Sequence, residues 1–326
     1  MQLNPVPPEV AHAGMRGLKT IALADGELHA LERRMLEGVQ RHLLHSSFDV
    51  DALEPIAPSQ LAEAVASAEL RERLLAGFTV MALIDGEPSR VEADLLDDCA
   101  RAFGVTRHAY ANVRRLIDHQ LLVTRIDIAR RSFLGQRGRS YLAEHGVRGF
   151  ARTLRSLVGI ENPALAARYQ ALEHTPRGTL GREYFEFVRA NGFALPGEQD
   201  AAPEIVVFHD CLHVLAEYDT NSLEETQIAS FQAGVLKKDS VYGLLFMLSQ
   251  FHLGVQMTPV TGAEKMVADP MRMLEAFARG CKVNRDLCVD WRPADDFHRS
   301  VVELRREFAI EPRTKGSRPS NTCPPG

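Results

Sequence analysis

The 326-residue sequence is poor in aromatic side chains, closely spaced cysteines and long apolar runs. Aromatic residues make up 7% of the chain and few segments alternate as strands do, which favours a mostly helical protein. The five cysteines have no close Cys-x-x-Cys spacing, which indicates a reducing compartment. They are Cys99, Cys211, Cys281, Cys288 and Cys323.

The sequence also lacks a large excess of either charge, since its formal net charge at pH 7 is −5. This balance argues against bulk binding of nucleic acid. No stretch of 18 apolar residues exists, so we expect no membrane-spanning helix. The N-terminus, with Pro5, Pro7, Pro8 and Glu9, lacks the basic and apolar regions of a signal peptide. We therefore expect a cytoplasmic protein, with peripheral attachment to the inner face of the membrane as an extension of that prediction.

Length and composition predict two helical domains. A chain of 326 residues more often forms two domains than one, and 45% apolar residues can fill two cores. We place a smaller domain at residues 1–124 and a larger one at residues 125–312. The tail at residues 313–326, with Pro, Ser, Thr, Gly and Lys, is typical of disordered segments.

The smaller domain contains a repeat. Residues 22–27, Ala-Leu-Ala-Asp-Gly-Glu, recur sixty residues later as Ala-Leu-Ile-Asp-Gly-Glu at residues 82–87. The same register relates three further pairs, which are Gly17 and Gly77, Glu32 and Glu92, and Leu36 and Leu96. Each unit is typical of a helix that ends at Asp-Gly and is followed by a second helix. The repeat predicts two stacked helical hairpins.

This repeat resembles the TerB-like domain of the tellurite-resistance group, which has a doubled Asp-Gly-Glu motif in the same kind of turn. The match rests on Asp25, Gly26, Glu27, Asp85, Gly86 and Glu87. Two interpretations remain open. The carboxylates are able to hold a hard divalent cation, as the resemblance implies. Alternatively, the glycines end helices in the left-handed conformation and the glutamates favour the next helix N-terminus.

The second chemical motif is a pair of histidines with two carboxylates. His209 and His213 lie one turn apart if the segment is helical, with Asp210 beside them, and Glu225 follows eleven residues after His213. Such a set suits a first-row metal. The alternative is structural, because Ser222 and Glu225 have the spacing of a capping box and Asp210 is free to face solvent.

Apolar spacing predicts how these residues meet. Residues 205–215 have helical periodicity, although Val206 and Val207 leave a short strand open. Residues 218–221 are typical of a turn, and Ser222 opens a second helix that runs towards Leu236. A helical hairpin of this shape brings Glu225 back to the histidines.

The His-Asp-x-x-His motif followed by eleven residues and Glu resembles the signature of the coenzyme Q protein four family of ubiquinone biosynthesis. Residues 178–182, Gly-Thr-Leu-Gly-Arg, also resemble a block of that family, and the resemblance covers roughly residues 130–312. The chain departs from the family at residues 205–208, where an arginine is usual, and at Glu217, where a glycine is usual.

The resemblance implies metal ligation by His209, Asp210, His213 and Glu225. Zinc is the expected ion, with iron or manganese as alternatives. It also implies oxidative removal of the ring carboxylate from a prenylated aromatic precursor of ubiquinone or a related quinone. In that reaction we assign catalytic roles to Asp210 and His252, although a histidine such as His252 is more often satisfied within a core. The expected partners are the isoprenoid substrate, other quinone-biosynthesis enzymes, a membrane surface and a second copy of the chain.

Two other functions stay open. A non-catalytic scaffold would bind a prenyl lipid for partner enzymes and keep the metal as a structural element. A metal-dependent hydrolase would use Asp210 as its base.

Two further segments allow alternative interpretations. The apolar run at residues 241–253 is either a core helix or one wall of a lipid tunnel. The segment 125–155 contains eight arginines, which form a solvated surface or attract anionic lipid headgroups or a prenyl phosphate.

Overall fold

The computed structural model describes residues 6–106, 109–143, 146, 160–258 and 261–313. The regular structure of these residues is helical. Two isolated bridges, Thr179 to Ser300 and Leu253 to Lys265, do not extend into a sheet within the described residues. The prediction of an all-α protein is confirmed.

The first 131 residues form seven α-helices and one π-helical turn among the described residues. They are α1 (Pro8–Ala22), α2 (Ala30–Gly38), η1 (Val39–Leu44), α3 (Pro58–Ala64), α4 (Ala68–Met81), α5 (Arg90–Phe103), α6 (Ala111–Ile117) and α7 (Leu121–Arg131). Residues 133–143 are also helical.

The remainder of the chain forms a second set of helices. They are α9 (Pro163–Gln170), η2 (Ala171–His174), α10 (Leu180–Ala190), η3 (Glu204–Val206), α11 (Val207–Ala216), α12 (Ser222–Val235), α13 (Ser240–Phe251), α14 (Pro270–Lys282), α15 (Pro293–Asp296) and α16 (Val301–Glu307). In the described part of the chain, no helix is both long enough and apolar enough to cross a membrane.

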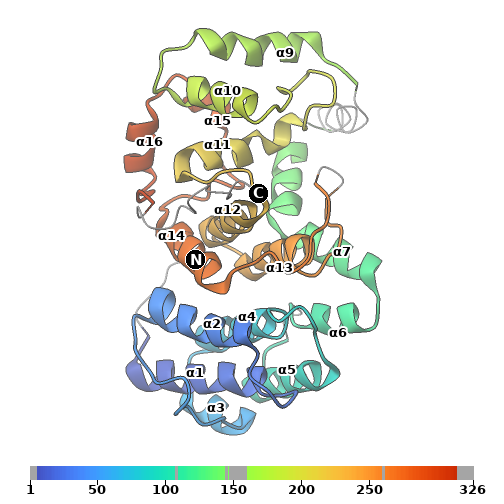
Figure 1. Ribbon diagram of the computed structural model, residues 1–326, viewed down its shortest axis with the longest axis vertical. Coiled ribbons are helices and arrows are strands. Elements are labelled where there is room, and N and C mark those ends of the chain that lie inside the picture. The colour runs from blue at the N-terminus through green and yellow to red at the C-terminus, as the bar shows by residue number, and fades with distance from the viewer. Residues whose placement is uncertain (1–5, 107–108, 144–145, 147–159, 259–260, 314–326) are drawn as a thin grey trace, which may run out of the picture.

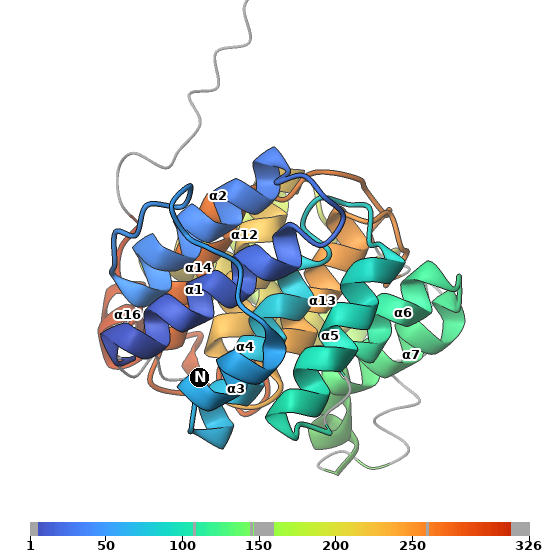
Figure 2. The ribbon, with the colours of Figure 1, turned by 90° about the horizontal axis from the view of Figure 1, so that it is seen from below.

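The helices are stacked in layers along the long axis of the molecule (Figure 1). Helices α1 to α6 form the lower part, α13 and α14 lie above them, and α12, α11, α10 and α9 follow in order. Seen from below, α1, α4 and α5 cover the helices of the second set (Figure 2). The N-terminal helices therefore cover one end of the stack.

The sequence repeat is also a structural repeat. Helix α1, an Asp-Gly turn and α2 correspond to α4, a second Asp-Gly turn and α5. Gly26 and Gly86 have φ angles of 116° and 87°, a region of the backbone map that side chains rarely occupy. The Asp-Gly pairs thus have a structural role in both turns, after the end of the first helix of each hairpin.

The glutamates at equivalent positions of the repeat cap the second helix of each hairpin. Glu32 and Glu92 accept hydrogen bonds from the backbone amides of His29 and Ser89, each at 2.8 Å. Both carboxylate side chains are buried. Burial, followed by nearby negative charge from the Asp-Gly turns, raises the pKa of Glu32 to about 8 and that of Glu92 to about 7. These carboxylates do not form a group with metal-ligand spacing in the described residues. The cation interpretation of the turns stays a prediction.

One hydrophobic cluster runs through both sets of helices, from Ala13 to Ile310. Helices α2 and η1 pack against α14, and α4 and α7 pack against α13. Arg34 of α2 forms an ion pair with Asp269, at 2.7 Å, just before α14. The predicted domain boundary at residue 124 falls within helix α7, which contacts both sets.

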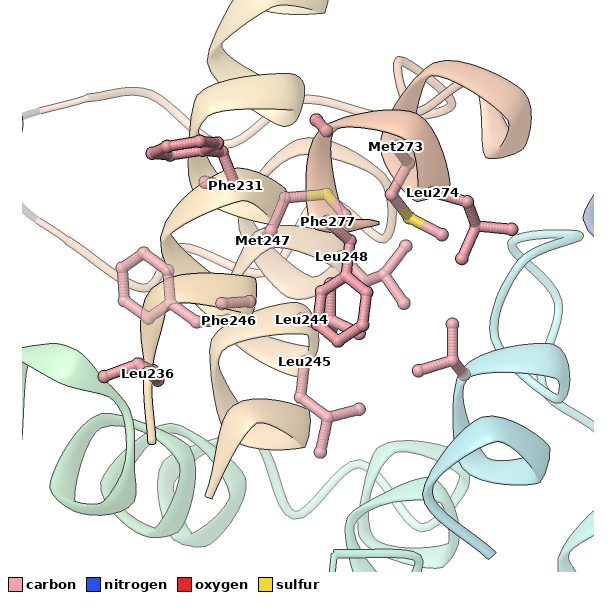
Figure 3. Packing of buried hydrophobic residues seen from close by; sticks show 14 of the residues in the cluster. Phe231, Leu236, Leu244, Leu245, Phe246, Met247, Leu248, Met273, Leu274 and Phe277 are labelled. Atoms are coloured by element: carbon pink, nitrogen blue, oxygen red, sulfur yellow. The ribbon is translucent and has the colours of Figure 1, made fainter. Parts of the chain in front are cut away.

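Helices α12 and α14 approach closely because glycines face each other at their crossing. A Cβ atom added to Gly280 would lie 2.0 Å from the carbonyl oxygen of Phe231, and one added to Gly234 would lie 2.2 Å from that of Phe277. Figure 3 shows the apolar side chains of these helices and of α13 around this contact. The crossing holds α12, which carries Glu225, in the centre of the second set.

The apolar run at residues 241–253 forms α13, whose residues from Tyr242 to Phe251 are all buried. The core interpretation of this run is confirmed. In the basic segment, residues 144–145 and 147–155 lie outside the described residues.

The end of the described chain is anchored rather than free. Residues 314–326 of the predicted disordered tail lie outside the described residues. Arg313, however, donates two hydrogen bonds to Glu224, at 2.6 and 2.9 Å, and the side chains are 7% and 0% exposed. This ion pair fixes Arg313 against α12, and the disorder of the tail stays a prediction.

Candidate metal centre

Helix α11 presents both histidines of the motif on one face. It runs from Val207 to Ala216 and follows a single 3₁₀ turn, η3, so the short strand considered for Val206 and Val207 does not form. The helical spacing places the rings of His209 and His213 with their centroids 4.7 Å apart. Their Nε2 atoms are 3.1 Å apart and face the same point.

Glu225 reaches this point from the first turn of α12. Its carboxylate oxygens lie 3.5 Å from Nε2 of His209 and 3.4 Å from Nε2 of His213. One ligand atom from each of the three residues lies within 4.8 Å of the other two. In the described part of the chain, no other group of three His, Cys, Asp or Glu side chains has this spacing. The hairpin of α11 and α12 thus joins two nitrogens and a carboxylate, as its sequence predicts.

The capping alternative for Glu225 is wrong. The N-cap of α12 is Asn221, whose side chain accepts the amide of Glu224 at 3.1 Å. It is Glu224, not Glu225, that reaches back, because it accepts the amide of Asp219 at 2.9 Å. The hydroxyl of Ser222 donates instead to Glu264. Glu225 is therefore available for the cluster with the histidines.

The orientation of His213 is set by its other ring nitrogen. Nδ1 lies 3.1 Å from the carbonyl oxygen of Tyr218. Because a carbonyl oxygen can only accept a hydrogen bond, the proton of the neutral ring lies on Nδ1. The lone pair of Nε2 then faces Glu225 and His209. The ring of Phe187, from α10, stacks on that of His213 with centroids 5.3 Å apart. These contacts hold the imidazole in the tautomer that a metal at Nε2 requires.

His209 has an equivalent partner in Gln232. The side-chain amide of Gln232 lies 2.8 Å from Nδ1 of His209, with its nitrogen closest, and its oxygen has no hydrogen-bond partner in the described structure. Rotating the amide by half a turn brings the oxygen to Nδ1, where it accepts a proton. Both a metal-bound His209 and a protonated His209 carry hydrogen on Nδ1. Gln232 is thus suited to orient His209 in either state.

Charge coupling within the cluster moves the pKa values of the two histidines apart. Burial lowers the pKa of His209, but the hydrogen bond and charge of Glu225 outweigh it and raise the pKa to about 9. Burial and the charge of His209 lower the pKa of His213 to about 4. Burial raises the pKa of Glu225, but His209 outweighs it and the net shift is downward. The metal-free cluster is therefore an imidazolium–carboxylate pair beside a neutral imidazole.

Asp210 lies next to this cluster but outside the group of three ligand atoms. Burial raises the pKa of Asp210 to about 6, with His209 acting in the opposite direction and Glu225 in the same one. Of the four predicted ligands, the structure brings His209, His213 and Glu225 together and leaves Asp210 outside the group. A carboxyl group with a pKa near 6 is suited to exchange protons near neutral pH.

His252 is not part of the cluster. It follows the end of α13, and its Nε2 lies 2.9 Å from the carbonyl oxygen of Ile84 while Nδ1 accepts the amide of Ala268 at 3.2 Å. Both ring nitrogens are engaged by backbone groups, and the side chain is buried. The structure places His252 in a contact between the two sets of helices, which is the core role that the sequence left open.

Sequence reasoning missed Gln232, Phe187 and the carbonyl group of Tyr218. A signal existed for Gln232, because it follows Glu225 by seven residues and so lies on the same face of α12. Phe187 had no local signal, since α10 reaches His213 only through the tertiary fold. The block at residues 178–182 contributes indirectly: the amides of Leu180 and Gly181 bind carbonyl groups of Arg299 and Phe297, which fixes the start of α10.

Two nitrogens and one carboxylate fit a catalytic metal better than a purely structural one. Structural zinc is bound by four protein ligands, whereas catalytic zinc keeps three and leaves a position for water or substrate. The same donor set is also that of iron enzymes that use oxygen. The residues therefore fit a divalent metal and do not select its identity.

No model of a known protein family matches this chain, and searches of curated proteins and of solved structures find no similar protein.

Proposed function

We propose that the protein is a metal-dependent oxidative decarboxylase of a prenylated aromatic acid in the biosynthesis of ubiquinone or a related quinone. The observation that carries this proposal is the convergence of His209, His213 and Glu225 on one point. The spacing of the motif supplies the substrate class through its resemblance to the coenzyme Q protein four family. Zinc is the first metal to test, followed by iron and manganese.

The reaction breaks the bond between a ring carbon and its carboxylate and forms a carbon–oxygen bond at the same carbon. Carbon dioxide leaves, and the ring loses two electrons, so an oxidant such as dioxygen must accept them. A metal held by the three ligands would supply Lewis acidity beside the substrate carboxylate.

The chain itself contributes orientation and proton transfer. Tyr218 and Gln232 fix the two imidazoles, and the stacked ring of Phe187 covers one face of His213. Asp210, with its pKa of about 6, is placed to take or give a proton next to the cluster.

Two neighbouring glutamates provide a matched test of the metal site. Glu225→Gln removes a ligand charge, so metal content measured by elemental mass spectrometry should fall from about one ion per chain to well below that. Glu224→Gln weakens the ion pair with Arg313 and should lower the melting temperature while metal content persists. Full metal content in Glu225→Gln, or loss of metal in Glu224→Gln alone, would contradict the site.

Turnover requires a separate assay. The metal-loaded protein is incubated aerobically with a prenylated hydroxybenzoic acid that carries an isotope in its carboxyl group. We expect labelled carbon dioxide and a ring hydroxylated at the same carbon, and both should be lost in His213→Ala. If the protein holds its metal but releases no labelled carbon dioxide, the decarboxylase proposal is wrong.

The alternative is a non-catalytic scaffold that binds prenyl lipid at a membrane surface for partner enzymes. One observation favours it, namely the exposed apolar face of α7, where Leu122, Val123 and Ile126 are 69%, 49% and 58% exposed. Arg125 is exposed on the same helix. An apolar face beside a basic side chain suits an interface with anionic lipid.

Vesicle binding tests this attachment. The protein should sediment with phosphatidylglycerol vesicles more than with phosphatidylcholine vesicles, and Leu122→Ser with Ile126→Ser should abolish the difference. Val302→Ser is the matched control, because Val302 is equally exposed on α16. Equal sedimentation of the double variant and the wild type would exclude α7 as the attachment face.

A further inference from the structure

A cavity of about 800 Å³ lies where the N-terminal helices meet α13 and α14. Helices α1, α2 and α4 and the turn η1 contribute one side, and the starts of α13 and the middle of α14 contribute the other. Ligand pockets in proteins have volumes of about 300–1,000 Å³, whereas well-packed interiors contain few voids larger than a water molecule. The volume is therefore that of a binding site rather than of a packing defect.

Helices α1 and α4 present several small side chains to the cavity. The small lining residues on these two helices are Ala11, Gly14, Ala76 and Gly77. A Cβ atom added to Gly77 would have as its nearest neighbour Cδ2 of Leu18, at 3.9 Å, which is ordinary contact. Space thus remains beside Gly77 for a larger group.

The interior of the cavity is lined mainly by apolar side chains. Buried examples are Leu18, Met35 and Leu75 from the N-terminal helices, with Leu274 and Phe277 from α14. Figure 3 shows Leu244, Leu274 and Phe277 among the side chains of α13 and α14 at this contact. A lining of this kind suits a flexible hydrocarbon chain, which gains from burial and needs no hydrogen bond.

Charged residues lie in two short stretches of the lining. Residues 69–73 contribute Glu69, Glu72 and Arg73, and residues 237–239 contribute Lys237, Lys238 and Asp239. These residues are exposed or half-buried, so they mark the mouth of the cavity. Three of these residues are cations and three are carboxylates, and Arg73 already pairs with Glu69 at 2.6 Å. The mouth accommodates a polar end group without selecting its charge.

We propose that this cavity binds one long aliphatic chain, of a fatty acyl or polyprenyl compound, with the polar end of the ligand at the mouth. The site is separate from the metal centre, since His209, His213 and Glu225 are not among the residues that line it. It needs both sets of helices, because neither α1 and α4 nor α13 and α14 enclose the cavity alone. Binding at this site is independent of the proposed decarboxylation.

The test is a competition experiment on the full chain. The probe is a dansyl-labelled undecanoic acid, whose fluorescence rises in an apolar site, and the competitors are palmitate and geranylgeraniol. Displacement by palmitate alone assigns an acyl chain, displacement by geranylgeraniol alone assigns a prenyl chain, and either outcome supports the proposal. Lack of probe binding, or displacement by neither competitor, overturns it.

Variants at Gly77 locate the binding. Gly77→Leu fills the cavity and should weaken probe binding by about tenfold or more, whereas Gly77→Ala has the same backbone effect and should leave affinity within about twofold. Metal content should be equal in both, which separates this test from that of the metal centre. Unchanged affinity in Gly77→Leu overturns the proposal.

A second pair protects the test against a folding defect at Gly77. Ala76→Phe adds a ring inside the cavity, and Ala68→Phe adds the same ring at an exposed position of α4. Only Ala76→Phe should lose probe binding, with both variants keeping a cooperative thermal transition. The oligomeric state is measured by size-exclusion chromatography. If the probe binds only to a dimer, the binding site is formed by two copies of the chain rather than by this cavity, and the proposal is overturned.

Discussion

Gln232 is the side chain that contacts Nδ1 of His209, and so it is suited to set which nitrogen of that ring carries the proton. Its amide nitrogen lies 2.8 Å from Nδ1, and half a turn of the amide brings the oxygen, which has no other partner in the described structure, to accept a proton from Nδ1. Because the second nitrogen of a ligating histidine controls its tautomer, a group such as Gln232 acts on metal affinity without touching the metal. The residue is a positioning residue and its effect is measurable.

Gln232→Leu should weaken metal binding by about 10- to 100-fold, because Nδ1 of His209 loses its acceptor. Gln232→Glu should keep the affinity, since a carboxylate also accepts this proton. Competition with a chelator of known affinity measures both. Equal affinity of Gln232→Leu and wild type would show that His209 is oriented without Gln232.

The buried capping glutamates make stability depend on pH. The folded pKa values of Glu32 and Glu92, about 8 and about 7, lie above those of the unfolded chain. The folded state therefore keeps protons that the unfolded state has lost. Their contribution is complete below about pH 4.5, falls as pH rises, and is lost above about pH 8.

Glu32→Gln should raise the free energy of unfolding by about 1 kcal/mol or more at pH 8, and have little effect at pH 4. Glutamine still caps the helix but carries no charge to desolvate. Glu27→Gln, at an exposed position of the same repeat unit, is the control and should change neither value. Urea unfolding at the two pH values measures the effect, and a pH-independent difference would contradict it.

At the scale of helices, the hairpin that carries the candidate metal centre follows from local sequence. Apolar periodicity predicted α11, and Ser222 was correctly placed as the first residue of α12. The identity of the capping glutamate was not predictable, because Glu224 and Glu225 are adjacent and only the fold shows which faces Asp219 and which faces the histidines. The stacking of Phe187 likewise depends on tertiary packing that periodicity does not encode.

The crossing of α12 and α14 allows a sharp test. Gly280→Ala would place Cβ 2.0 Å from a backbone oxygen of α12, which cannot move without displacing the helix. We expect destabilisation of about 3 kcal/mol or more. Gly138→Ala, with no heavy atom within 4 Å, should stay within about 1 kcal/mol of wild type. Denaturant unfolding of the two variants compares them, and similar stabilities would mean that the helices separate easily.

The whole molecule has one continuous hydrophobic cluster, although its sequence predicts two domains. Composition and length set only an expectation of two cores, and the contact between α2 and α14 joins residues far apart in the chain. The interface also contains the bond from His252 to Ile84. The boundary proposed at residue 124 stays a prediction, but the two sets of helices are not independent in their packing.

The two sets of helices should therefore unfold together in a single transition. Trp291, the single tryptophan, is buried in the second set and reports by fluorescence. Cys99 is a buried free thiol in the first set and reports by its rate of alkylation, located by mass spectrometry. The two midpoints in urea should coincide. Midpoints that differ by more than their errors would show two separately folding units.

The ion pair of Arg313 with Glu224 makes the end of the described chain part of the fold around the start of α12. Glu224 precedes Glu225 of the candidate metal centre, and removal of residues from 313 onward would leave the buried carboxylate of Glu224 without its cation at the start of α12. A truncation or a cleavable tag placed just before Arg313 would then lower the stability of the fold at the start of α12. Fusion partners for this protein belong beyond residue 313, with a spacer that lets the guanidinium reach its place.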